Sequence, residues 1–305
     1  MNDFLKNNFE SDFKTINGLK FRIWRNFEVD ELDEQTEVVC FLYGLLCSFD
    51  HYEHQITFLH EQDRKIILMD FRGHHSLNVN CPIEEINFKN ITSDFLKLFD
   101  LYGLKNLHLI GHSMGVNIAL NITLELMQAN KPTPKSLILI SGTVFPPQNV
   151  MFDSHIMHFA QPILESLYEK FPKVMTSYWK KQKDWAIVRK FVHTNGFNPK
   201  KVSKEFIKIY LSKIARFTPK LFFQLLNEMR DHHVIGLIHD IQLPTLIISG
   251  DQDKIIPLHL QKIFHEHIEG SELYIVSGGN HVPQLDDTKG CNERIQIFYE
   301  QFFKV

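Results

Sequence analysis

Uninterrupted apolar runs recur along the chain and alternate with segments of helical periodicity. Runs of this length, without polar alternation, are typical of strands buried on both faces of a parallel sheet. Between two of them, Ile91, Phe95, Leu98 and Tyr102 repeat at helical spacing, and Asn90 is positioned to cap that helix. Helices between parallel strands form right-handed crossovers that cover the sheet. The pattern predicts an α/β fold with a mostly parallel sheet, whose main strands are residues 38–42, 66–69, 107–110, 136–141, 244–249 and 272–276.

The beginning of the chain carries two weaker patterns. Phe21 and Ile23 alternate with arginines, which indicates a half-exposed strand. Apolar residues from Leu5 to Ile16 recur at spacings of four, four and three, which predicts an amphipathic helix. Its acidic residues outnumber its lysines, whereas a helix lying on a membrane favours a basic face. We expect this helix to dock on the protein.

A stretch of about a hundred residues between two predicted strands contains helical patterns and no clear strand. Ile156, Ile163, Leu167 and Phe171 form one stripe, and Thr218-Pro219 is a typical helix start. Phenylalanine is barely enriched there, so we expect most of its aromatic side chains to be ordinary core. The sequence predicts a helical insertion, or cap, at 144–240, and a core made of 1–143 and 241–305.

The pentapeptide Gly111-His112-Ser113-Met114-Gly115 joins the apolar run at 107–110 to a helical pattern. A G-x-S-x-G sequence in this context is typical of a nucleophile elbow, a sharp strand-to-helix turn that exposes the serine hydroxyl. The flanking glycines avoid clashes in the turn. The following helix directs its unpaired N–H groups toward the place where an oxyanion would form.

A serine at an elbow needs a base to take its proton, and the base needs an acid to orient it. The run at 244–249 is followed by two carboxylates, Asp251 and Asp253, and the run at 272–276 is followed by His281. Parallel strands bring such distant residues to one edge of the sheet. The chain therefore offers serine, acid and histidine in that order, with two candidates for the acid.

The elbow and four further motifs in register resemble those of the α/β-hydrolase superfamily, in the branch with a helical cap after the sixth strand. Besides the elbow, Tyr43-Gly44-Leu45 matches its early H-G loop, and Asp70-Phe71-Arg72-Gly73-His74-His75 matches its D-x-R-G-H-G run. Gly250, Asp253 and Pro257 match its acid motif, and Gly278-Gly279-Asn280-His281 matches its histidine motif. The resemblance runs over most of the chain.

This resemblance implies a carboxylesterase-like or lipase-like serine hydrolase acting on esters of short to medium acyl chains. Its catalytic residues would be Ser113, Asp253 and His281, with Asp253 preferred to Asp251 because it occupies the motif position. The backbone N–H groups of Leu45 and Met114 would form the oxyanion hole. The resemblance implies no cofactor and no metal.

Two residues depart from the family pattern. Tyr43 replaces a histidine that supports the oxyanion loop, so we expect altered packing without loss of activity. His75 stands where glycine is usual, a position at which a left-handed backbone would be strained.

The same fold and residues also support thioesterases, C–C bond hydrolases, acyltransferases and cofactor-free haloperoxidases. A ligand-binding receptor built on a hydrolase scaffold is an alternative from a different class. A serine at the elbow argues against dehalogenases and epoxide hydrolases of this fold, which place aspartate there. The substrate itself and the oligomeric state are not specified by the sequence.

Composition agrees with a soluble enzyme of this size, whose substrate the resemblance implies to be a small acyl ester. The chain has 305 residues and a formal charge of −3, so it has no basic excess for nucleic acid. We expect a cytoplasmic protein without stable membrane insertion, because no signal-peptide pattern and no run of eighteen apolar residues is present.

The four cysteines show neither zinc spacing nor C-x-x-C pairing. Cys47 lies near the expected oxyanion loop, where either a reactive thiol or an inert buried one would fit. Nothing near it in the sequence would lower its pKa, which favours the inert thiol.

Overall fold

The computed structural model describes residues 2–74, 81–153 and 156–302. These residues form an eight-stranded sheet in the order β1-β2-β4-β3-β5-β6-β7-β8. The first two strands pair antiparallel, and β3 to β8 run parallel. The predicted α/β class is confirmed, with strands at Glu10–Ile16 (β1), Leu19–Arg25 (β2), Glu37–Leu42 (β3), Lys65–Met69 (β4), Asn106–His112 (β5), Ser136–Ile140 (β6), Thr245–Gly250 (β7) and Glu272–Val276 (β8).

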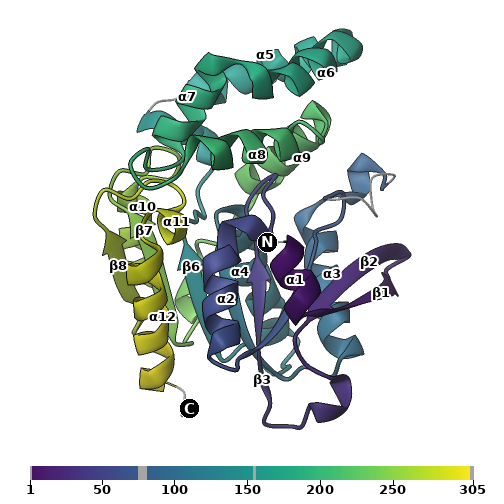
Figure 1. Cartoon of the computed structure of the whole chain (residues 1–305), viewed down its shortest axis with the longest axis vertical. Helices are drawn as coiled ribbons and strands as arrows, with labels where there is room; N and C mark the ends of the chain where they lie inside the picture. Colours follow the sequence, from purple (N-terminus) through teal and green to yellow (C-terminus); the bar gives the residue numbers. More distant parts are fainter. Residues whose placement is uncertain (1, 75–80, 154–155, 303–305) are drawn as a thin grey trace.

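Helices cover both faces of the sheet (Figure 1). On one face α2 (Glu53–Glu61) contacts α12 (Thr288–Phe302), and on the other α3 (Phe88–Leu101) contacts α4 (Met114–Gln128). Two further helices, α10 (Leu258–His267) and the short α11 (Pro283–Asp286), flank β8 in the sequence. The central strands β4 to β7 are buried almost throughout, as their continuous apolar runs predict.

The N-terminal helix is shorter than predicted. Helix α1 spans Asn2–Asn8, and the chain then forms strand β1. A tight turn at Asn17 (φ 47°) and Gly18 (φ 79°) pairs Ile16 with Leu19. Positive φ at both turn residues is the geometry of a type I′ hairpin turn, which Asn-Gly favours. The prediction of a helix up to Ile16 was therefore wrong, because residues 10–16 pair with β2 in a hairpin despite their helical spacing.

Helix boundaries show one correct and one displaced capping residue. The side chain of Thr218 accepts a hydrogen bond from the backbone N–H of Leu221 and begins α9, as predicted. The cap of α3 is Asn87, whose side chain accepts from the N–H of Asn90, so the prediction of Asn90 as the cap was displaced by one turn.

Within the described residues, five α-helices lie between β6 and β7, and we call them the cap helices. They are α5 (Ile156–Lys170), α6 (Pro172–Lys181), α7 (Ala186–Asn195), α8 (Lys204–Ile214) and α9 (Pro219–Arg230). They form a layer beyond one end of the sheet, with α5 and α6 farthest from it (Figure 1). The expectation that most aromatic side chains of residues 144–240 are core holds only in part: Phe197, Phe217 and Phe223 are buried, whereas Phe159 and Phe171 are exposed.

A buried ion pair joins the loop after β4 to α3. The guanidinium of Arg72 donates two hydrogen bonds of 2.7 Å to the two carboxylate oxygens of Asp94. Asn17 donates a third, of 2.9 Å, to the same carboxylate. Both charged side chains are almost completely buried. The attraction between them therefore offsets most of the hydration free energy that each charge loses on burial.

Removing one member of this pair should destabilise the fold. Arg72→Met leaves the Asp94 carboxylate buried without its cation, and we expect the free energy of unfolding in urea to fall by about 3–5 kcal/mol. The control is Arg230→Met, which breaks an exposed pair with Asp231 and should cost less than about 1 kcal/mol. Equal losses in the two variants would contradict the assignment of a buried, mutually compensated pair.

Candidate active site

The turn from β5 into α4 places Ser113 at the carboxyl end of the central strands. Ser113 has φ 54° and ψ −120°, a conformation that residues with side chains rarely adopt. Its backbone N–H donates a hydrogen bond of 2.9 Å to the carbonyl of Ile140 at the end of β6. The strand, strained serine and helix are the geometry expected of a nucleophile elbow.

The two glycines of the pentapeptide are required by close backbone contacts. A Cβ at Gly115 would lie 2.0 Å from the carbonyl oxygen of Leu42, at the end of β3. A Cβ at Gly111 would lie 2.7 Å from the carbonyl oxygen of Gly115. The elbow is therefore pressed against the loop after β3, and no side chain fits at either position.

The structure brings Ser113, His281 and Asp253 into one hydrogen-bonded chain. The Nε2 of His281 lies 3.1 Å from Ser113 Oγ, and its Nδ1 lies 2.9 Å from Asp253 Oδ2. The other carboxylate oxygen, Asp253 Oδ1, accepts hydrogen bonds from the backbone N–H groups of Ile255 and Ile256. All three side chains are buried, so their mutual hydrogen bonds are little weakened by water.

The rival acid Asp251 lies elsewhere. Its Oδ1 accepts a hydrogen bond of 2.8 Å from the backbone N–H of Gly278, in an exposed position. Asp251 therefore holds the loop that leads to His281, and the histidine ring itself contacts Asp253.

The expected oxyanion loop passes directly beside the elbow. An added Cβ at Gly44 would lie 3.0 Å from Ser113 Cβ, so the backbone that leads to Leu45 adjoins the serine. Met114 is the first residue of α4, and its N–H therefore has no acceptor within the helix. The N–H groups of Leu45 and Met114, which the sequence singled out, therefore belong to two backbone segments that adjoin Ser113: the loop after β3 and the first turn of α4.

Tyr43 takes the supporting position beside this loop. Its hydroxyl accepts a hydrogen bond of 2.8 Å from the N–H of Phe71 and donates one of 3.1 Å to Asp70. The tyrosine is fully buried, and burial raises the pKa of its hydroxyl well above the ordinary value. It thus ties the loop after β3 to the loop after β4. His75, the other departure, lies outside the described residues.

Comparison with known proteins identifies the family of this chain. A family model described as serine aminopeptidase, S33, matches residues 33–287. The chain belongs to this family of α/β-hydrolases. Among solved structures, a bromoperoxidase from Bacillus anthracis superposes with a TM-score of 0.73 at 20% identity, covering 95% of this chain and 100% of that one.

Two further relatives show how varied the named activities are. An esterase from Exiguobacterium antarcticum superposes on this hydrolase with a TM-score of 0.71 at 20% identity, covering 95% of this chain and 100% of that one. AB hydrolase superfamily protein YisY of Bacillus subtilis is 23% identical over 264 residues, 85% of this chain and 90% of the relative. Likeness at these identities identifies the fold and leaves the reaction open.

Sequence reasoning did not single out His112, which fixes the backbone of this hydrolase's histidine loop. Its Nε2 lies 2.8 Å from the carbonyl oxygen of His281 and donates to it. Burial, followed by the nearby His281, lowers the pKa of His112 well below its ordinary value, so the ring is neutral. Its place inside the pentapeptide, at the end of β5 and next to the serine, was the available signal.

A second contact that the sequence did not indicate joins the histidine loop to the cap helices. The buried carboxylate of Asp286 accepts hydrogen bonds from the N–H of Asn280 at 2.6 Å and of Asn198 at 2.7 Å. The side-chain amide of Asn280 donates to the carbonyl of Phe197, and that of Asn198 donates to the carbonyl of Gly278. Three of these hydrogen bonds connect the segment after α7 to the region that carries His281, and the fourth, from Asn280 to Asp286, lies within that region.

A cavity of about 110 Å³ lies beside His281. Its walls include Phe191 and Phe197 from the cap region and His51 and Cys47 from the loop after β3. Burial lowers the pKa of His51 to about 4 and raises that of the Cys47 thiol to about 12. The burial of Cys47 supports the inert thiol that the sequence favours. The cavity is small and mostly apolar.

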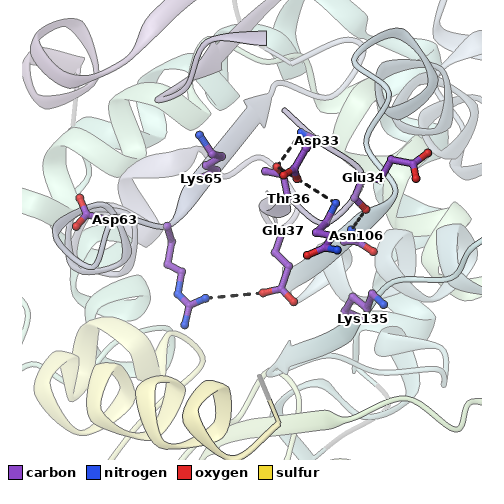
Figure 2. A pocket seen from close by; sticks show the side chains of 10 residues that line it. Asp33, Glu34, Thr36, Glu37, Asp63, Lys65, Asn106 and Lys135 are labelled. Carbon is purple, nitrogen blue, oxygen red and sulfur yellow. Dashed lines mark hydrogen bonds and ion pairs between the residues drawn. The ribbon is translucent and has the colours of Figure 1, made fainter. Parts of the chain in front are cut away.

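A larger pocket lies at the opposite end of the sheet, at the start of β3, β4 and β5. Its volume is about 730 Å³. Figure 2 shows Asp33, Glu37, Lys65 and Lys135 around it. Glu37 pairs with Arg64 at 3.8 Å within it. Its open, polar walls and its distance from Ser113 along the strands indicate a solvated surface hollow.

Within the described ranges, no group of three or more His, Cys, Asp or Glu side chains is arranged to hold a metal ion. None of the helices in the described part of the chain is long and apolar enough to cross a bilayer.

The buried histidines should make stability depend on pH. The folded pKa of His51, about 4, is below its ordinary value of 6.5, so the unfolded chain binds more protons between these values. Stability should therefore fall as the pH is lowered through this range. Removing His51 in the variant His51→Phe should reduce the slope of unfolding free energy against pH by about one proton.

Urea unfolding at a series of pH values measures this slope. The matched control is His54→Phe, an exposed histidine three residues further along the chain, which should leave the slope unchanged. An identical slope in the wild type and in His51→Phe would contradict a neutral, buried His51.

Proposed function

We propose that the protein hydrolyses carboxylic esters with short to medium acyl chains, through an acyl-enzyme on Ser113. The observation that supports this most strongly is the continuous hydrogen-bonded chain from Ser113 through His281 to Asp253, at the tip of a strained elbow. The proposed division of the chain is a catalytic core of residues 1–143 and 241–305 and a cap of residues 144–240. The reaction as proposed needs neither a metal nor a cofactor.

In the first half-reaction, Ser113 Oγ attacks the acyl carbon while its proton passes to His281 Nε2. The carbonyl oxygen becomes an oxyanion, which accepts hydrogen bonds from the backbone N–H groups of Leu45 and Met114. The bond from the acyl carbon to the alcohol oxygen then breaks, and His281 returns the proton to the departing alcohol. Asp253 holds the imidazole in the correct tautomer and stabilises its protonated form.

In the second half-reaction, His281 takes a proton from a water molecule as that water attacks the acyl carbon. The bond to Ser113 Oγ breaks, the serine regains its proton, and the carboxylic acid leaves. An acyltransferase differs only in accepting an alcohol in place of the water, and a thioesterase only in the leaving thiol. A panel of esters, thioesters and alcohols as acceptors distinguishes these reactions.

The roles of the acid and the nucleophile lead to one set of variants. Ser113→Ala should reduce kcat for p-nitrophenyl acetate by about 10⁶-fold, since the three residues act as a unit. Asp253→Asn should cost about 10³-fold or more, because the histidine loses the group that fixes its tautomer. Asp251→Asn, the matched control, keeps an acceptor for Gly278 and should cost less than about tenfold. A larger loss from Asp251→Asn than from Asp253→Asn would reverse the assignment of the acid.

The cavity beside His281 is proposed to receive the acyl chain, with Phe191 limiting its length. Phe191→Ala should raise the ratio of kcat/KM for octanoate to that for butyrate, by up to about fourfold for each CH₂ that becomes buried. Steady-state hydrolysis of p-nitrophenyl esters from acetate to octanoate measures the ratio. The control Ile187→Ala changes an exposed residue of the same helix that does not line the cavity, and should leave it unchanged. An unchanged ratio in Phe191→Ala would place the acyl chain elsewhere.

A further inference from the structure

Charge is distributed unevenly between the two parts of the chain. Residues 144–240 contain fifteen Lys and Arg against eight Asp and Glu, a net charge of +7, although the whole chain carries −3. The remaining residues therefore carry −10. A charge difference of this size within one chain indicates that the cap helices face an anionic partner.

The outer cap helices α5, α6 and α7 also expose large apolar side chains. Phe159 is 69% exposed, Ile163 is 62% exposed and Ile187 is 77% exposed. Phe171, Val174 and Phe191 are each more than half exposed. We call these six residues the outer cap surface. Monomeric proteins rarely expose so many large apolar residues on neighbouring elements without a binding role.

Packing within the cap explains why the residues on α5 point outward. Gln161 is buried and donates a hydrogen bond of 2.7 Å to Asn227 of α9, which defines the inner side of α5. Phe159 and Ile163 lie two residues away from Gln161 on either side, about 160° around the helix. They therefore project from the side opposite to α9. Figure 1 shows α5 and α6 as the layer farthest from the sheet.

Helix α7 connects this surface to the candidate active site. His193 is the buried residue of α7, and its Nε2 lies 2.7 Å from the carbonyl oxygen of Val202. Phe191 is exposed and also lines the cavity beside His281. The outer cap surface therefore reaches the wall of the cavity.

A groove of about 550 Å³ between α7 and α8 combines the two properties. Cationic side chains Arg189, Lys190, Lys204 and Lys208 line it together with Ile207 and other apolar groups. Apolar walls with a cationic rim match an anionic amphiphile, whose headgroup meets the cations and whose chain meets the apolar side chains.

We propose that the outer cap surface docks on anionic phospholipid membranes, as a peripheral contact without insertion of a spanning helix. Basic residues near an anionic lipid surface contribute about 1 kcal/mol each, and apolar side chains add their burial below the headgroups. A nucleic acid would use the cations and leave the aliphatic residues exposed. Docking would hold the cavity wall at Phe191 next to the lipid surface.

The binding test uses the full chain with the Ser113→Ala substitution, so that hydrolysis cannot alter the lipid. Vesicles of phosphatidylcholine alone are compared in co-sedimentation with vesicles that contain one-third phosphatidylglycerol. We expect binding to the mixed vesicles at least about tenfold tighter than to phosphatidylcholine, and weaker binding as salt is raised. Equal binding to both vesicle types, or none to either, would overturn the proposal.

Two sets of variants locate the contact. The pair Ile163→Asn and Ile187→Asn should weaken binding to mixed vesicles by about tenfold, since two apolar side chains lose their burial. The matched control pair, Leu101→Asn and Ile297→Asn, replaces exposed apolar residues of α3 and α12, and should leave binding unchanged. Lys190→Gln with Lys208→Gln removes two cations of the groove and should reduce the preference for phosphatidylglycerol.

The occupant is distinguished by the oligomeric state. Three results together would show that a second copy covers the surface. The chain would sediment as a dimer without lipid, the Ile163→Asn and Ile187→Asn variant would be monomeric, and neither would bind vesicles. This result would overturn the lipid proposal. Hydrolysis of soluble p-nitrophenyl acetate should be unchanged in the same variant without Ser113→Ala, so failure of the docking proposal is distinguishable from failure of the proposed ester activity.

Discussion

The close approach of the elbow to the end of β3 is the constraint on which the rest of the site depends. With no side chain at Gly115, the first turn of α4 lies against the carbonyl of Leu42, where any Cβ would overlap it. That contact sets the distance between Ser113 and the loop at Gly44, and hence the position of the expected oxyanion donors. The strained backbone of Ser113 is tolerated because β5 and α4 are both firmly packed, so the surrounding structure leaves the serine no alternative conformation.

Features encoded locally were predictable from the sequence. The central strands are continuous apolar runs, and the elbow is a five-residue pattern between a strand and a helix. The N-terminal prediction failed because helical spacing up to Ile16 was weighed without the turn that follows. Asn17-Gly18 was a visible hairpin signal, and a hairpin that joins the sheet gains hydrogen bonds that an isolated amphipathic helix does not. The N-cap of α3 was predicted at Asn90 instead of Asn87 for a similar reason, since either asparagine has a side chain that can cap a helix.

Contacts between distant segments were not predictable in this way. Nothing near Asp286 in the sequence indicates that its carboxylate joins Asn198 to Asn280, because the partners come from separate elements. Likewise, the sequence pattern of the exposed side of α5 is the same as that of a helix face that packs on the core. The stripe through Ile163 and Leu167 has the spacing of a buried helix face, and only the orientation set by Gln161 shows that it faces away from the protein.

The hydrogen bonds around Asp286 bear on how specificity and catalysis are linked in this hydrolase. The segment that follows α7 is hydrogen-bonded to the loop of His281, while Phe191 in α7 lines the cavity next to the same histidine. A displacement of α7 therefore changes the cavity and strains the histidine loop together. Since a fraction of an ångström at His281 Nε2 alters its hydrogen bond with Ser113, α7 cannot move freely to admit a larger substrate without affecting the proton transfer. The helices between β6 and β7 thus adjoin the same histidine as the elbow does, whereas the fold shared with solved structures at about 20% identity leaves the reaction open.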